Sequence, residues 1–414
     1  MKILAVGELF PWPAEGGGLM RLAGWVEALA RTGDVDLFCL YDPELPRDVP
    51  ATVPIARVGT VPRPKRGPTW RWRTRWLTHR GMPLRVAMVD GERAPRRAFD
   101  SWVADGYDLV WFNTAELYHL LGRPDLGPTI VDLDNLESEK ERQRGQHLRE
   151  AAAGGGPVAV LRSRLAALQA TIDARDWDRF QRGVAAQVDR VALCSRTDVG
   201  RSGLANAEVV ENSFRRPEHP LGRVDVADPP VILFQGTLNY QPNVDAAAWL
   251  VDDLAPRIRT LVPDAQVRLV GQTVPRVNRM DDPPAVTVLG RIPDMAPELA
   301  RADIAVVPLL VGSGTRLKIL ESFAHRIPVV STIIGADGLD VVDGVHLLLA
   351  DDPDAFARAC HRLLTEPDLR VRLAVAAEAL FLERYESSTA QQHLEALVRD
   401  VATTGGRHGA GRRP

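Results

Sequence analysis

Residues 312–321, with the sequence GSGTRLKILE, bring together side chains that suit a phosphorylated ligand. The apolar run before them predicts a buried strand and the apolar spacing after them predicts a helix, so a glycine-rich turn leads into a helix start. Backbone N–H groups and the helix dipole attract an anion there. Arg316 and Lys318 add positive charge, and Glu321 adds an acceptor for vicinal hydroxyls. This chemistry suits the diphosphate and ribose of a nucleotide sugar; the alternative is an ordinary strand-to-helix junction with a solvated basic pair.

Length and composition limit the class of protein. A chain of 414 residues favours two domains, and 45% hydrophobic with 25% charged residues is typical of a soluble globular protein. A net charge of −3 argues against general nucleic-acid binding. Cys39, Cys194 and Cys360 lie far apart in apolar contexts, which predicts buried free thiols and a reducing compartment. The apolar run at the N-terminus is too short for a signal peptide or a membrane span.

Strands and helices alternate along both halves of the chain, which predicts two doubly wound α/β domains. In the first domain we expect strands at residues 3–6, 36–40, 109–112, 129–133 and 190–195. In the second we expect them at residues 231–234, 266–270, 286–289, 304–308, 328–331 and 345–350. The expected divisions are a first domain at 1–215, a proline-rich linker at 216–230, a second domain at 231–385, a last helix at 386–402 that can cross back to the first domain, and a disordered tail at 403–414.

Glycines and polar residues follow the strands of the first domain. Gly16, Gly17 and Gly18 come after the first strand, where doubly wound sheets bind ligands and where glycine lets a diphosphate approach closely. They do not form a dinucleotide fingerprint, and a flexible loop is the alternative. Asn113 follows one strand, and residues 134–138 (DNLES) follow the next.

The segment at residues 63–85 is rich in arginine, contains no acidic residue and includes Trp70, Trp72 and Trp76. Basic residues interleaved with tryptophan suit an anionic surface such as phospholipid headgroups or a phosphorylated lipid. The alternative is an insertion that packs on its own domain.

Together, these features resemble the GT-B glycosyltransferases and, more narrowly, family 4, the retaining group that uses nucleotide-activated sugars. The supporting segments, in order, are residues 234–240 (FQGTLNY), 289–292 (LGRI), 312–321 (GSGTRLKILE), 329–332 (VVST) and 335–338 (GADG). The resemblance implies two Rossmann-like domains that face each other across a cleft.

The resemblance also implies roles for individual residues. Glu321 matches the second acid of the family's paired-glutamate motif and would accept from ribose, whereas Ser313 stands where the first acid usually holds the donor sugar. Thr237 stands where many members carry an arginine for the diphosphate, so Arg316 and Lys318 would replace it. The other donor-binding positions implied are Gly16, Gly17, Gly18, Gly236, Arg291, Ile292, Gly314, Thr315 and Leu317. Asn113 aligns with a histidine beside the donor sugar, and the implied acceptor-side residues are Asp134, Asn135 and Glu137.

The activity implied is transfer of a sugar from a UDP- or GDP-sugar to a hydroxyl of a glycan, glycolipid or natural product, with retention of the anomeric configuration. Arg316 and Lys318 would stabilise the leaving diphosphate, with Asn113 beside the sugar. No metal or other cofactor and no nucleic-acid partner is expected. The expected location is cytoplasmic, with possible peripheral contact at the inner membrane face through residues 63–85.

Two other functions remain open on the sequence. A catalytically silent glycosyltransferase-like binding subunit would explain the serine at position 313 and the asparagine at position 113. A nucleotide-sugar epimerase would share the fold but would need acid and base side chains at the sugar, for which the sequence offers few candidates. The acceptor is open between a lipid-linked saccharide and a soluble natural product or cyclitol.

Overall fold

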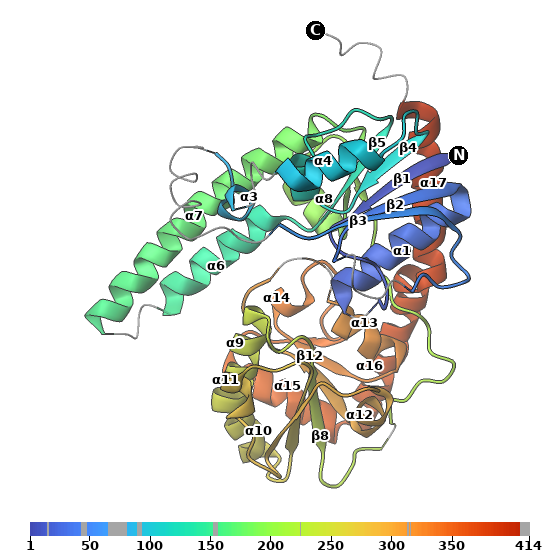
Figure 1. The fold of residues 1–414 in the computed structure, drawn as a ribbon. Coiled ribbons are helices and arrows are strands. Elements are labelled where there is room, and N and C mark those ends of the chain that lie inside the picture. The colour runs from blue at the N-terminus through green and yellow to red at the C-terminus, as the bar shows by residue number, and fades with distance from the viewer. Residues whose placement is uncertain are drawn as a thin grey trace. The chain divides into compact units, whose positions relative to one another are not determined.

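The computed structural model describes residues 1–14, 16–42, 48–64, 81–88, 93–151, 156–223, 225–312, 314 and 316–405. The chain divides into two compact units, Met1–Val210 with Gln391–Pro414, and Glu211–Ala390. Each unit contains one parallel sheet with helices on its faces (Figure 1). The fold class expected from the sequence, two doubly wound α/β domains, is therefore confirmed. The first unit ends at Val210, a few residues before the boundary expected at 215.

The sheet of the first unit has the strand order β3-β2-β1-β4-β5-β6-β7. All its pairings are parallel. Its central strands are almost wholly buried, as expected for continuous apolar runs covered on both faces. The strands are β1 (Lys2–Gly7), β2 (Asp34–Leu40), β3 (Ile55–Val61), β4 (Leu109–Phe112), β5 (Thr129–Asp134), β6 (Arg190–Leu193) and β7 (Ala207–Val209).

Helices cover both faces of this sheet. They are α1 (Gly17–Thr32), α3 (Leu84–Ala87), α4 (Arg93–Trp102), α5 (Ala115–Leu120), α6 (Glu137–Ala151), α7 (Pro157–Ala185), α8 (Arg196–Ser202) and α17 (Ser387–Thr404). Trp25 of α1 stacks on Trp111 of β4 with 5.1 Å between ring centroids. Leu394, Val398 and Val401 of α17 are buried in the same core, so the last helix of the chain completes the first unit. Helix α17 includes Thr403 and Thr404, which the sequence analysis placed in the tail.

The second sheet has the strand order β10-β9-β8-β11-β12-β13, again all parallel. Its strands are β8 (Val231–Gln235), β9 (Gln266–Val270), β10 (Val286–Gly290), β11 (Ile304–Val307), β12 (Val329–Ser331) and β13 (Leu348–Leu349). Its helices are α9 (Gln241–Trp249), α10 (Ala255–Leu261), α11 (Pro275–Asn278), α12 (Ala296–Arg301), α13 (Leu317–Ala324), α14 (Ile333–Ala336), α15 (Pro353–Thr365) and α16 (Pro367–Leu380), with π-helical segments η2 (Leu250–Leu254) and η3 (Phe381–Tyr385).

In each sheet, the connections from one strand run to one side and those of its later strands run to the other side. In the first sheet β1 lies between β2 and β4, and in the second β8 lies between β9 and β11. Open α/β sheets bind ligands outside the carboxyl ends of the strands at such a switch point. A ligand site is therefore expected at the loops after β1 and β4 and at those after β8 and β11.

The structure confirms that the three cysteines are buried free thiols, as expected from the sequence. Cys39, Cys194 and Cys360 are free and buried. Burial raises the pKa of the Cys39 and Cys360 thiols, so these two are protonated and unreactive at neutral pH. In the described residues, no helix combines the length and apolar character that crossing a membrane requires.

Candidate functional site

Glycine residues line the carboxyl edge of the second sheet. Gly236, Gly271 and Gly290 follow or end β8, β9 and β10, with φ angles of 150°, 137° and 68°. The N–H of Gly236 donates to the carbonyl of Val270, and the N–H of Gly271 donates to the carbonyl of Gly290, each at 2.9 Å. A Cβ at position 271 would lie 1.7 Å from the carbonyl oxygen of Gly236. Only glycine therefore allows the β8 and β9 loops to pack this closely, and the edge exposes backbone instead of side chains.

Lys318, in the first turn of α13, lies against the Gly236 loop. Its Nζ donates to Oδ1 of Asn243 at 3.0 Å, and Nδ2 of Asn243 donates to the carbonyl of Thr237 at 3.0 Å. The ammonium also lies 4.4 Å from the ring centroid of Phe234. Asn243 thus fixes the lysine and the loop after β8 together at the switch point of the sheet.

The pKa values of Lys318 and Glu321 are both shifted toward neutral pH. Burial, and to a lesser extent the charge of Arg316, lowers the pKa of Lys318 to about 7. Burial raises the pKa of Glu321 to about 7, although a hydrogen bond from Nε2 of Gln235 at 2.8 Å partly opposes this. Shifted pKa values of this kind are common at functional sites. A bound ligand can supply the negative charge that Lys318 lacks and the hydrogen-bond donors that the carboxylate of Glu321 lacks.

Arg316 lies at the start of α13 and turns back toward the loop after β11. Its Nη2 donates to the carbonyl of Ile334 at 3.4 Å. A Cβ at Gly312, where φ is 152°, would lie 2.5 Å from this same nitrogen. Gly314 is buried in the loop. Ser313 and Thr315, two of the expected donor-binding residues, lie outside the described residues.

Other residues singled out from the sequence lie at the same edge. Thr237 is exposed after β8, Arg291 is exposed after β10, and Ile292 and Leu317 are half-buried. Two further residues at this edge, Gln235 and Asn243, hold Glu321 and Lys318 and were not predicted as site residues from the sequence. The only local signal for Gln235 was its position directly before Gly236 at the end of a buried strand.

The corresponding edge of the first unit begins with the Gly16–Gly18 run. Gly16, with φ of 83°, precedes α1, and a Cβ at Gly16 or Gly18 would meet nothing within 4 Å. Asn113 follows β4, is half-buried, and donates its backbone N–H to the carbonyl of Val6 at 2.9 Å. These residues therefore lie in the connections after β1 and β4, the strands on either side of the first unit's switch point.

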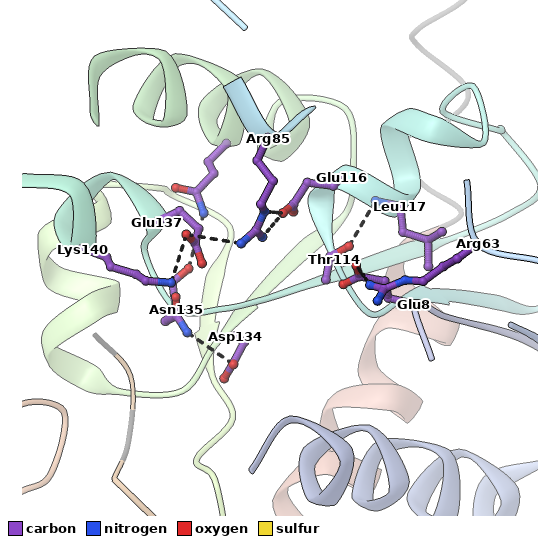
Figure 2. A network of polar contacts seen from close by, with 11 residues as sticks. Glu8, Arg63, Arg85, Thr114, Glu116, Leu117, Asp134, Asn135, Glu137 and Lys140 are labelled. Atoms are coloured by element: carbon purple, nitrogen blue, oxygen red, sulfur yellow. Dashed lines mark hydrogen bonds and ion pairs between the residues drawn. The ribbon is translucent and has the colours of Figure 1, made fainter. Parts of the chain in front are cut away.

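Figure 2 shows a network of charged residues beyond the ends of β4 and β5. Arg85 of α3 lies between Glu116 of α5 and Glu137 of α6: Nε donates to Oε1 of Glu116 at 3.1 Å, and Nη1 is 3.7 Å from Oε2 of Glu137. Lys140 is 3.5 Å from the same oxygen of Glu137. Burial raises the pKa of Glu116, an effect that the charge of Arg85 opposes. Glu137, expected on the acceptor side, is thus already engaged by two cations.

Asp134 and Asn135 lie next to this network. Asp134 has a positive φ of 58°, and Nδ2 of Asn135 is 3.3 Å from Oδ2 of Asp134. Arg21 of α1 approaches Asp134 at 3.4 Å and forms a buried bidentate pair with Asp132 of β5, at 2.8 and 2.7 Å. Arg21 therefore holds the end of β5 against α1.

The basic segment at residues 63–85 is only partly described. Arg63 pairs with Glu8, and Arg85 pairs with Glu116 and Glu137, so both described arginines are engaged within the protein (Figure 2). Trp70, Trp72 and Trp76 lie outside the described residues.

The neighbouring aspartates Asp281-Asp282 and Asp351-Asp352 include three side chains that accept hydrogen bonds from backbone N–H groups. Asp352 caps α15 through the N–H of Ala355 at 2.9 Å, Asp351 accepts from the N–H of Ile333 at 2.8 Å, and Asp281 accepts from the N–H of Val288 at 2.7 Å. In the described part of the chain, no group of three or more His, Cys, Asp or Glu side chains is arranged to hold a metal ion.

Comparison with known families finds a match within the second unit. Residues 229–366 match the family model described as Glycosyl transferases group 1. The matched stretch is similar to a group 1 glycosyltransferase domain. It includes β8, α13, Lys318 and Glu321 and ends within the connection from α15 to α16.

Solved structures extend the likeness to both units. Sucrose-phosphate synthase from Thermosynechococcus elongatus is 18% identical, covers 97% of this chain and 99% of its own, and has a TM-score of 0.65. Anabaena HepE, in complex with UDP and glucose, is 16% identical, covers 97% and 100%, and has a TM-score of 0.59. At such identities the likeness shows the fold, which is GT-B.

A curated relative matches over a shorter stretch. An uncharacterized 44.6 kDa protein in the cps region of Klebsiella pneumoniae is 24% identical over 165 residues, which is 38% of this chain. The match covers 42% of that protein's length.

Proposed function

We propose that the protein is a retaining glycosyltransferase of family 4 that moves a hexosyl group from a UDP- or GDP-sugar to a hydroxyl acceptor, a glycan, a glycolipid or a natural product. The group 1 match over residues 229–366 and the UDP and glucose bound by the structurally similar HepE support this proposal. The observation that carries it is the ammonium of Lys318, packed against Gly236 at the switch point of the second sheet.

In this proposal the chain's main catalytic task is to stabilise the departing diphosphate. Lys318 and Arg316 lie on either side of the start of α13, where the backbone N–H groups of the first turn also point outward. Fixed cations and dipoles of this kind lower the barrier when negative charge develops on the leaving group. The departing phosphate oxygen can accept the proton of the attacking hydroxyl on the same face of the sugar, which would retain the anomeric configuration.

Glu321 and the first unit supply the remaining contacts in the proposal. The carboxylate of Glu321, oriented by Gln235, would accept hydrogen bonds from the vicinal ribose hydroxyls. Asn113 would hydrogen-bond the donor sugar, and Asp134 and Asn135 would bind the acceptor. Glu137 would mainly position Arg85 and Lys140 near the acceptor, because both cations already pair with its carboxylate.

The direct test is to incubate the purified protein with a panel of UDP- and GDP-sugars and to measure release of nucleoside diphosphate. Release that increases with a hydroxyl acceptor supports the transferase, and the anomeric configuration of the first-formed product, measured by NMR, tests retention. Donor binding without release or transfer would instead support a silent binding subunit.

The pKa shifts predict how donor affinity depends on pH. Lys318 loses its charge as pH rises through about 7, and Glu321 loses its charge as pH falls through about 7. The diphosphate favours charged Lys318 and the ribose favours ionised Glu321, so affinity for UDP-glucose should be greatest near neutral pH and should fall on both sides. Calorimetry across pH measures this, and Glu321→Gln should remove the acid limb while keeping the alkaline limb. An affinity that does not change with pH would contradict the assignment of both residues.

Gly236→Ala should weaken donor binding by tenfold or more, roughly 1.4 kcal/mol. Its Cβ would lie 2.9 Å from Nζ of Lys318 and 3.3 Å from Nδ2 of Asn243, so the lysine must move. Gly344→Ala is the matched control, because Gly344 also has a positive φ (71°) but its Cβ would meet nothing within 4 Å. Both variants should lose some stability because each places alanine at a positive φ, and only Gly236→Ala should lose affinity for UDP-glucose; equal affinities would count against the site.

A further inference from the structure

The α6–α7 hairpin of the first unit carries large apolar side chains on its exposed surface. Val158, Leu161, Leu165 and Leu168 of α7 are 64%, 60%, 59% and 57% exposed. Their spacing of three, four and three residues places them on one face of the helix, and we call them the α7 stripe. Figure 1 shows that the hairpin extends well past the edge of the first unit's sheet. The stripe therefore lies on a projecting element and not beside the sheet.

The hairpin does not need the α7 stripe for its own packing. Helices α6 and α7 pack through small residues: Ala167, Ala170 and Ala174 are buried, and a Cβ at Gly145 of α6 would lie 3.5 Å from both the carbonyl oxygen of Ala167 and Cβ of Ala170. Leu165 and Leu168 each precede one of these alanines by two positions, which is roughly 200° around a helix. The leucines thus point away from α6. If the hairpin only had to pack its two helices together, leucines between the helices would bury more apolar surface.

Arginines flank the α7 stripe on both sides. Arg162 and Arg164 are exposed, and neither forms an ion pair with any residue that the structure describes. Residues 156–172 contain no acidic residue. At the same end of the hairpin, Arg149 of α6 donates to Oγ1 of Thr171 at 2.8 Å. The exposed face of α7 is therefore an apolar row with positive charge along its borders.

We propose that the α7 stripe docks the protein on an anionic lipid bilayer. The leucines would enter the interfacial region, and Arg162 and Arg164 would contact lipid phosphates at its surface. A second copy of the chain fits less well. In an antiparallel seam centred on the stripe, Arg162 of one copy would oppose Arg164 of the other, and such like charges repel. The complementary partner is a negatively charged surface that accepts aliphatic side chains.

Sedimentation of the full-length protein with vesicles tests the proposal. The protein should bind vesicles of phosphatidylglycerol and phosphatidylcholine, bind phosphatidylcholine alone much more weakly, and lose binding as salt increases. The variant Leu161→Gln/Leu165→Gln/Leu168→Gln should lower the partition coefficient by about tenfold or more. Arg162→Gln/Arg164→Gln should lower it by about tenfold or more on the anionic vesicles only.

Exposed valines of the second unit provide a matched control. Val371 and Val375 of α16 are 44% and 54% exposed, one helical turn apart, and Val371→Gln/Val375→Gln should bind vesicles as the wild type does. Thermal unfolding of each variant checks that the fold is kept. Failure of the wild type to bind anionic vesicles, or equal binding by the leucine variant, would overturn the proposal. It would also be overturned if light scattering showed a dimer that the leucine variant dissociates, or if only Trp70→Ala/Trp72→Ala/Trp76→Ala abolished vesicle binding.

Discussion

Replacing Lys318 by methionine should lower the turnover of UDP-glucose or of the preferred donor by about 10²–10³-fold, because one fixed positive charge at the leaving group is lost. Methionine fills a similar volume, so the sheet and α13 should remain intact. Lys318→Arg keeps the charge and should recover part of the rate, although its planar group does not match the position of Nζ beside Asn243. Single-turnover kinetics at saturating donor separates this effect from donor binding.

The same substitution should make the protein more stable at neutral pH. The pKa of Lys318 is lowered to about 7 in the native state, against about 10.4 for an ordinary lysine, so the unfolded chain binds more protons between these values. The free energy of unfolding therefore increases as pH rises from about 7 to 10. At pH 7 and below, the buried ammonium of Lys318 destabilises the native state, and methionine removes this destabilisation. Lys318→Met should melt at a higher temperature than the wild type at pH 7. A variant that is both less active and less stable would point to a structural role for the lysine.

Replacing Arg21 by methionine should cost about 3–5 kcal/mol of unfolding free energy. The side chains of Arg21 and Asp132 are 4% and 0% exposed, so the substitution leaves a buried carboxylate without its counter-ion. It also removes the hydrogen bond from Nη1 to the carbonyl of Val210 at 2.7 Å. Denaturant unfolding measures the loss.

The matched control for that experiment is Arg182→Met. Arg182 pairs with Asp178 one turn away on α7 at 3.0 Å, but its side chain is 48% exposed. Exposed pairs of this kind contribute at most about 1 kcal/mol. If Arg21→Met cost no more than Arg182→Met, the Arg21–Asp132 pair would not be what holds the end of β5 in place.

The strands and helices of the second unit follow closely from the sequence. Strand β9 (Gln266–Val270) agrees with the expected strand at both ends. Helix α15 (Pro353–Thr365) begins after its cap Asp352 and has proline at its first position, both ordinary start signals of a helix. Strand β3 (Ile55–Val61) was missed, since it lies at the sheet edge and exposes Ala56 and Arg57. Helix α4 (Arg93–Trp102) was also missed, since only Pro95 and Phe99 are buried.

The contacts of the candidate site could not be read from the sequence. Gln235 and Glu321 are 86 positions apart, and Asn243 and Lys318 are 75 apart, so only the fold brings each pair together. The pKa shifts depend on how deeply α13 is buried, which residue types do not reveal. The place of Gly271 against Gly236 likewise depends on the register of β8 and β9. What the sequence did predict was the position of Lys318 and Glu321 in one helix turn after a glycine-rich loop.

A crystal structure of the protein with UDP tests the central proposal most directly. We expect a β-phosphate oxygen at about 2.7–2.9 Å from Nζ of Lys318, the usual length of a charge-assisted hydrogen bond, with the ribose hydroxyls at Glu321. A bound UDP whose phosphates lie away from Lys318 and Arg316 would contradict it.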